Sequence, residues 1–287
     1  IFLGEQLEDV VEQIVRGDVS SSIQGSKLDT GVHVLPVLKK DATDRNRTSP
    51  FAFTGNKFEF RMLGSSMSIA GANFVLNTIV ADTLQQFADE LEKADDFNKA
   101  VKEVIKKAIT EHQRVIFNGD GYSDEWVAEA EKRGLPNVKS MVEAVPYLVT
   151  VELFERQNVL SKAELESRAE INYENYSKTI NIEAKTMIDM AGKQFIPAVI
   201  SYVTSLADSV NTVTAACAAA DVSVQTELLT KCSSLLAKAQ KALANLEKVN
   251  AEAAEKEEGQ EQALFFKNTV FVAMEELRAP IDELEMI

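Results

Sequence analysis

Residues 57–79, KFEFRMLGSSMSIAGANFVLNTI, contain the change from strand-like to helix-like sequence. The first six residues alternate between charged and apolar side chains, so the two kinds face opposite sides of a predicted strand. The charged side carries Lys57, Glu59 and Arg61. From Ser68 onward the strand pattern nearly vanishes and helical spacing takes over. The chain is therefore predicted to be α+β, with a sheet-bearing first part followed by a mostly α-helical C-terminal bundle.

Apolar residues at helical spacing predict most of the remaining elements. The expected helices cover residues 5–16, 72–93, 97–114, 123–133, 147–156, 162–210, 222–258 and 262–277. Gly17 should stop the first helix, and Pro197 should kink or divide the long one. Residues 31–38, which include His33, are β-branched and apolar and indicate a strand. The last three helical segments are expected to pack as an antiparallel bundle.

Composition excludes several classes of function. The chain has 287 residues and a formal net charge of -15, which argues against nonspecific nucleic-acid binding. The longest apolar stretch, 196–220, is interrupted by polar residues, so no membrane span is expected. Two cysteines, Cys217 and Cys232, form no CxxC cluster and are expected to be reduced thiols in a cytoplasmic protein. Ile1 without an initiator Met or a signal pattern suggests a start within a longer polypeptide.

A local basic island stands out in this acidic chain. Arg45, Arg47, Lys57 and Arg61 lie within a stretch of 17 residues, around a single carboxylate, Glu59. A carboxylate is a suitable oxygen ligand for Mg²⁺ or Mn²⁺, and arginine can hold carboxylate or phosphate oxygens with two parallel hydrogen bonds. This combination suits phosphoryl transfer, in which cations and guanidinium groups stabilise the charge on the migrating group.

An ordinary structural explanation of the same residues remains open. An exposed Lys-x-Glu-x-Arg strand face is commonly a solvated row of ion pairs. One carboxylate is also too few ligands for a closed site, because Mg²⁺ takes about six. Spacing alone therefore leaves both explanations in place.

Several longer runs resemble the C-terminal portion of type III glutamine synthetases. They are DRNRTSPFAFTGNKFEFR at 44–61, MLGSSMSIAGAN at 62–73, VLNTI at 75–79, FNGDGYSDEW at 117–126 and KTINIEA at 178–184. The resemblance implies that Glu59 is a ligand of a catalytic divalent cation. It also implies that Arg61 contacts glutamate or its phosphorylated intermediate, and that Arg47 contacts the ATP phosphates and the phosphoryl group in transit.

The sequence departs from the wider family at one place. Glutamine synthetases usually carry a second arginine five residues after the first, and here that residue is Ala52. Arg45 and Lys57 are weak candidates to replace it. In the family, the other cation ligands, the main nucleotide-binding segments and the glutamate flap all precede this region, so the resemblance implies that the chain alone is inactive.

The resemblance also implies an architecture and an assembly. Residues 1–115 would be the C-terminal part of the catalytic domain, with part of the glutamine synthetase-type catalytic β-sheet, and residues 116–287 a helical region. The parent enzyme would join L-glutamate and ammonia through γ-glutamyl phosphate, using ATP and Mg²⁺ or Mn²⁺, as a cytoplasmic dodecamer of two hexameric rings. Two alternatives remain: a helical structural or interaction protein, and a related carboxylate-amine ligase that uses another amine.

Overall fold

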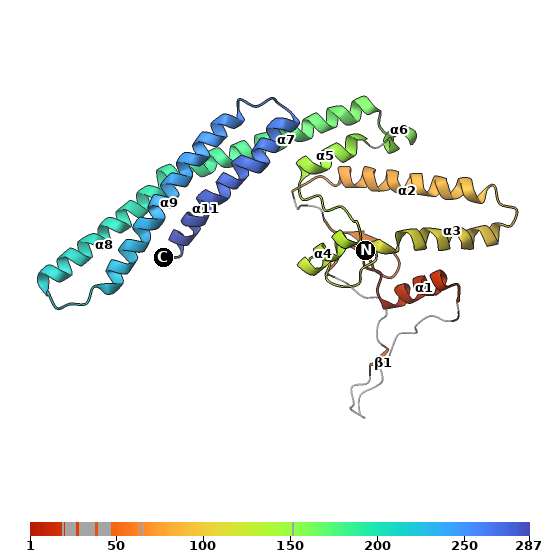
Figure 1. Cartoon of the computed structure of the whole chain (residues 1–287), viewed down its shortest axis with the longest axis horizontal. Helices are drawn as coiled ribbons and strands as arrows, with labels where there is room; N and C mark the ends of the chain where they lie inside the picture. Colours follow the sequence, from red (N-terminus) through yellow and green to blue (C-terminus); the bar gives the residue numbers. More distant parts are fainter. Residues whose placement is uncertain are drawn as a thin grey trace. The chain divides into compact units, whose positions relative to one another are not determined.

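The structure is a computed structural model, and it describes residues 1–18, 20, 27–28, 38–39, 47–62, 64, 66–150 and 152–287. The chain forms two compact units (Figure 1). The first unit comprises residues 1–138 together with 153–159, and the second comprises 139–152 together with 160–287. The predicted strand at 31–38 and His33 lie outside the described residues, except for Leu38. The division of catalytic and helical domains at residue 115 stays a prediction.

The first unit contains five α-helices among its described residues. They are α1 (Glu5–Arg16), α2 (Ala70–Leu91), α3 (Phe97–His112), α4 (Asp124–Lys132) and α6 (Leu153–Arg156), and a 3₁₀ turn, Gln113–Val115, follows α3. Helix α1 has the predicted bounds, and Gly17 ends it in the left-handed conformation at φ 78°. Ser123 begins α4 by accepting a hydrogen bond from the Trp126 backbone N–H. Local capping chemistry therefore sets these boundaries.

The strands of the first unit are short. In the described residues, β1 (Lys27–Leu28) pairs with β2 (Leu38–Lys39), and β3 (Phe51–Phe53) pairs with β4 (Phe58–Phe60), both antiparallel. Phe2 forms a parallel bridge with Ala52 and so extends the second sheet by one residue. The described chain is thus mostly helical with small sheets, and a larger catalytic sheet is not seen in it.

A polar cluster and an aromatic pair fasten α6 onto α2. The Arg156 guanidinium donates from Nε to Asp82 Oδ1 at 2.9 Å and from Nη2 to Asp82 Oδ2 at 3.0 Å. Gln157 also donates to Asp82 Oδ1, at 2.8 Å. These bonds, with the Arg156 hydrogen bond as the largest cause, lower the pKa of Asp82 below its usual value. Phe74 meets Phe154 edge to face, with ring centroids 5.8 Å apart.

The second unit is a bundle of long helices (Figure 1). Its members are α5 (Met141–Thr150), α7 (Lys162–Met190), α8 (Ile196–Ala216), α9 (Ser223–Ala253), α10 (Gln260–Phe265) and α11 (Phe271–Glu285). Helix α9 packs against both α8 and α11, while α5 and α10 pack against α7. Five-residue π turns, Ala191–Phe195 and Phe266–Val270, join α7 to α8 and α10 to α11. None of the helices in the described residues is both long and apolar enough to cross a membrane.

Sequence patterns predicted the bundle well but placed two helices wrongly. The long helix begins at Lys162 as predicted and is divided just before Pro197, which lies in the first turn of α8. The predicted helix at 147–156 is instead α5 and α6, because Ser140 starts a helix by accepting from the Glu143 backbone N–H. The last helix spans 260–285 rather than 262–277, because packing against α9 carries it through the buried Pro280.

The core of the second unit provides a stability prediction. Leu246 of α9 is fully buried in a cluster that also contains Ala184, Phe266 and Leu277. Leu246→Ala should lower the free energy of unfolding of this unit by about 3 kcal/mol, because it removes apolar contacts and leaves a cavity. Urea unfolding followed by circular dichroism measures the change. Val224→Ala, at an exposed position of the same helix, is the control and should stay within about 0.5 kcal/mol of the parent chain. A loss of similar size in both variants would contradict the assignment of Leu246 to the core.

Candidate functional site

The β3–β4 hairpin presents the candidate residues. Its register pairs Phe51 with Phe60, Ala52 with Glu59 and Phe53 with Phe58. Gly55, at φ 92°, supplies the left-handed residue of the connecting turn, and the Thr54 backbone N–H donates to Lys57 O at 2.8 Å. Residues directly opposite in an antiparallel pair share one face, so the side chains of Ala52 and Glu59 lie side by side on the same face.

Ala52 occupies the place of the family's second arginine and is completely buried. Phe2 lies beside it, with its backbone N–H donating to Phe51 O at 3.1 Å and its carbonyl accepting from Phe53 N at 2.9 Å. A side chain longer than alanine would have to displace these neighbours. The departure from the family pattern is therefore built into the packing of this hairpin.

The aromatic side chains of the hairpin gather on the opposite face. Phe51 stacks on Phe58 with ring centroids 5.5 Å apart, and it meets Phe60 edge to face at 6.1 Å. Phe53 and Phe58 lie 5.3 Å apart. Aromatic cross-strand pairs of this kind stabilise a hairpin and hold its register. The predicted separation of charged and apolar faces is confirmed.

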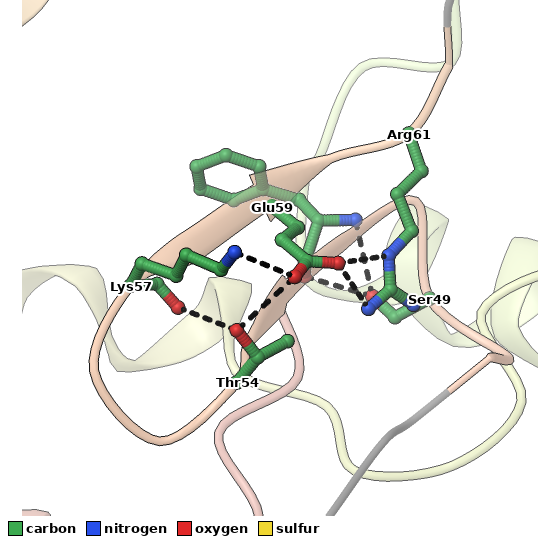
Figure 2. Close-up of polar contacts among 6 residues, drawn as sticks. Ser49, Thr54, Lys57, Glu59 and Arg61 are labelled. Carbon is green, nitrogen blue, oxygen red and sulfur yellow. Dashed lines mark hydrogen bonds and ion pairs between the residues drawn. The ribbon is translucent and has the colours of Figure 1, made fainter.

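Glu59 lies at the centre of the charged face (Figure 2). Arg61 donates to Glu59 Oε2 from Nη2 at 2.9 Å and from Nε at 3.1 Å. Glu59 Oε1 accepts from the Thr54 hydroxyl at 3.3 Å and lies 3.5 Å from the Lys57 ammonium. The hydrogen bond from Arg61, followed by its charge and that of Lys57, lowers the pKa of Glu59 below its usual value. Glu59 is therefore a carboxylate at neutral pH.

Arg47 stands apart from this group. Arg47 is exposed, and no hydrogen bond or ion pair joins it to Glu59 in the described part of the chain. Arg45 lies outside the described residues. Beyond Arg47 the loop is held down by Ser49, a buried residue whose hydroxyl donates to Phe51 O at 2.8 Å. The structure thus brings three of the predicted residues together, Lys57, Glu59 and Arg61, and shows no contact of Arg47 with Glu59 in the described part of the chain.

The turn at residues 118–121 supports the same loop, a role that sequence reasoning missed. The Gly121 backbone N–H donates to Thr48 O at 2.7 Å, and a Cβ on Gly121 would lie only 3.0 Å from that oxygen. Glycine is required by this close approach. Asn118 Oδ1 accepts from the backbone N–H groups of Leu3 and Gly4, at 2.9 and 3.1 Å. The run FNGDGYSDEW was the available signal, but its contacts are distant in sequence, and those of Asn118 span more than a hundred residues.

Trp126 anchors this support by packing. Its ring stacks on Phe117 with centroids 4.3 Å apart, and the Arg133 guanidinium lies 5.5 Å from the centre of the Trp126 ring. Arg133 also donates to Ile116 O at 2.8 Å. These contacts fix the segment that leads into the 118–121 turn.

The described residues do not form a complete cation site. They contain no group of three or more His, Cys, Asp or Glu side chains with the geometry to hold a metal ion. Glu59 offers one carboxylate, and each of its oxygens already has a partner within the hairpin. A cation at Glu59 would have to share or displace one of these contacts and draw its other ligands from elsewhere.

Comparison with known proteins gives a consistent result. Residues 100–214 match the model of the glutamine synthetase C-terminal domain. The type-3 glutamine synthetase of Dictyostelium discoideum is 42% identical over 219 residues, which is 74% of this chain and 30% of that protein. The glutamine synthetases of Butyrivibrio fibrisolvens and Bacteroides fragilis are 36% and 31% identical over the whole chain, which spans 41% of each relative. The chain thus covers less than half the length of these relatives.

Proposed function

Because the chain belongs to the glutamine synthetase family and matches the C-terminal portion of type III members, we propose that it supplies part of a glutamine-forming active site. The reaction is the ATP-dependent ligation of ammonia to L-glutamate through γ-glutamyl phosphate. The observation that carries the proposal is the Glu59–Arg61 pair on one face of β4, within a chain that matches two glutamine synthetases over its whole length. In this proposal, β3 and β4 belong to the catalytic sheet of the complete enzyme.

Arg61 is proposed to hold the carboxylate or phosphoryl oxygens of the substrate. Two of its guanidinium N–H groups bond the same oxygen of Glu59, which fixes the plane of the guanidinium. The Arg61 side chain is 26% exposed, so its surroundings are partly shielded from water. A planar, pre-oriented guanidinium loses little freedom when it binds a second planar anion. This supports a positioning and charge-stabilising role in phosphoryl transfer.

Glu59 is proposed as one ligand of Mg²⁺ or Mn²⁺. Its lowered pKa keeps the carboxylate charged, which a cation ligand requires. The remaining ligands would come from residues outside the described part of this chain. When bound, the cation would neutralise phosphate charge. Within this chain, Arg61, Lys57 and Thr54 orient the Glu59 carboxylate.

Arg47 is proposed to contact the phosphates of ATP, and its exposure leaves the guanidinium accessible. Lys57 is the better supported of the two replacements for the family's second arginine, because its ammonium lies 3.5 Å from Glu59 Oε1. Arg45 remains a weaker proposal. Both Lys57 and Arg47 are long enough to reorient towards an incoming anion.

The assembly is proposed to be two stacked hexameric rings, as the family resemblance implies. Phe58 and Phe60 are 49% and 40% exposed in this chain, although the aromatic face of a sheet is normally covered. Further chain or a neighbouring subunit would cover that face in the complete enzyme. A cytoplasmic location stays a prediction from the composition.

An assay of glutamine formation by the 287-residue chain alone tests the proposal. Purified residues 1–287 should form no glutamine from glutamate, ammonia and ATP, because one carboxylate and four basic groups do not complete a cation and nucleotide site. The complete enzyme, assayed in parallel for glutamine by chromatography, should be active. Steady glutamine formation by the 287-residue chain would contradict the prediction.

The complete enzyme also separates the alternatives. A structural or interaction protein would form no glutamine even with its complete chain. A related ligase would prefer an alkylamine to ammonia, and an amine series at fixed glutamate and ATP reads this preference directly.

A further inference from the structure

A polar groove lies between α7 and α9 of the second unit, next to the turn that leads into α10. Its volume is about 790 Å³, and it is partly open to solvent. Ser177 and Asn181 of α7 and Asn250 of α9 lie in its walls. All of these residues belong to the second unit, so the groove is independent of the hairpin that carries Glu59.

Two buried polar atoms in the groove lack a hydrogen-bond partner among the described residues. They are the Ser177 hydroxyl oxygen and the Asn250 side-chain oxygen. Ser177 is 4% and Asn250 8% exposed. The Asn250 amide is oriented by its other end, since Nδ2 donates to Asn181 Oδ1 at 3.1 Å. Buried polar atoms are rarely left unsatisfied, because they lose their hydrogen bonds to water without replacement.

The apolar contact between α7 and α9 beside the groove shows that packing alone does not require polar residues here. Ala184 on α7, with Leu246 and Ala253 on α9, are fully buried in the neighbouring apolar core. Small or aliphatic side chains in place of Ser177 and Asn250 would extend this apolar contact and leave no buried polar atom without a hydrogen bond. Groups that reduce stability without serving the fold are typical of binding sites.

The charges around the groove indicate the chemistry of the missing partner. Four carboxylates and two ammonium groups line it: Glu170, Glu174, Glu247, Glu258, Lys178 and Lys185. Lys178 is already paired with Glu174 one turn away. Among the described residues, no ion pair within 4 Å involves Glu170, Glu247 or Glu258. The lining therefore carries a net negative charge, which favours a cationic ligand.

The hydrogen-bonding capacity of the two buried atoms narrows the range of possible ligands. The Asn250 oxygen can only accept, so its partner must be a donor, and the Ser177 hydroxyl can accept as well. Ile171, Ala251 and Phe266 supply apolar wall on which a short methylene chain can lie. Gly259, at φ 99°, permits close approach by Glu170, whose Oε2 would be 3.0 Å from a Cβ at that position. Glycine at position 259 therefore leaves room for the Glu170 carboxylate beside the turn that leads into α10.

We propose that this groove binds a small aliphatic amine in its protonated form. An ammonium group donates to the Asn250 side-chain oxygen and the Ser177 hydroxyl, the methylene chain lies along the apolar wall, and the carboxylates that line the groove balance the charge. Water alone is the competing occupant, because an ordered water can also satisfy two buried polar atoms.

Isothermal titration calorimetry on the 287-residue chain tests the proposal with putrescine, a four-carbon diamine. We expect saturable binding to one site per chain at neutral pH and fixed ionic strength. Two probes of the same length serve as controls: 1,4-butanediol, which has no charge, and succinate, which has the opposite charge. Neither should bind, because neither provides an ammonium donor.

Matched serine variants locate the site. Ser177→Ala should weaken putrescine binding about ten-fold, since one hydrogen bond to a charged group is lost. The melting temperature of Ser177→Ala without putrescine should not fall, because alanine removes an unsatisfied buried hydroxyl and favours the helix. Ser167→Ala, the same change at an exposed position of the same groove, should leave the dissociation constant unchanged.

Two results would overturn the proposal. One is the absence of saturable binding up to about 10 mM putrescine, which corresponds to an affinity too weak to count as recognition. The other is equal putrescine affinity in Ser177→Ala and Ser167→Ala, which would place binding elsewhere. Either result would assign the groove to water alone.

Discussion

Glu59→Gln in the complete enzyme is expected to lower kcat/KM for glutamine formation by at least about 100-fold. Glutamine keeps the shape of the side chain but removes the charge that a divalent cation requires. The cation concentration at half-maximal activity should rise as well. A titration with Mn²⁺ at saturating ATP and glutamate measures both effects.

The control for this variant is Glu103→Gln. Glu103 lies on α3, is exposed, and forms an ordinary i,i+4 ion pair with Lys99 at 3.9 Å. Its replacement should leave both activity and cation dependence unchanged, because surface pairs of this kind contribute little. An unaltered Mn²⁺ titration in Glu59→Gln would remove Glu59 from the cation site and favour the solvated ion-pair explanation of the strand face.

The second large effect is expected from Arg61→Lys, with a loss of kcat of about 100-fold. Lysine keeps the positive charge beside Glu59, so the Glu59 carboxylate should stay ionised and the hairpin should stay folded. It cannot reproduce the planar pair of bonds that Arg61 makes from Nε and Nη2. Steady-state kinetics with glutamate and ATP varied separately should therefore show lost turnover in a folded protein.

Arg16→Lys provides the matched control for the arginine variant. Arg16 is exposed and, among the described residues, pairs with Glu12 one turn away at 4.0 Å. The same chemical change there should leave kcat at the parent value. Parent-like kinetics in Arg61→Lys would mean that charge alone suffices at this position, which would exclude bidentate recognition.

Sequence patterns predicted the features that depend on neighbouring residues. Gly17 and Ser123 mark helix ends because capping is decided within one turn. The charged face of Lys57, Glu59 and Arg61 follows from a period of two, and the contacts of Glu59 confirm it. Family resemblance, rather than spacing, supplied the chemical roles of these residues.

Features that depend on distant residues were not predictable in this way. The apolar pattern that begins at Tyr147 did not predict the start of α5 at Met141, where the Ser140 hydroxyl accepts from the Glu143 backbone N–H. The hydrogen bonds from Leu3 and Gly4 to Asn118 join residues 115 and 114 positions apart, and no local sequence pattern predicts them. The groove with Ser177 and Asn250 likewise forms only when α7 and α9 come together.

The two π turns carry a consequence for how this bundle can change in evolution. Each wide turn holds one residue more than an α-helical turn would, and Ala191, Phe266 and Val270 within them are buried in one core. Five residues of π turn rotate the chain by about the same angle as four residues of α-helix, so deleting one residue from 191–195 would restore regular winding and keep the phase of α8. Ile196 and Leu206 would then keep their buried positions on α8. Single-residue deletions should consequently be tolerated better in these turns than in the regular part of α7, where each deletion would rotate everything downstream by about 100°.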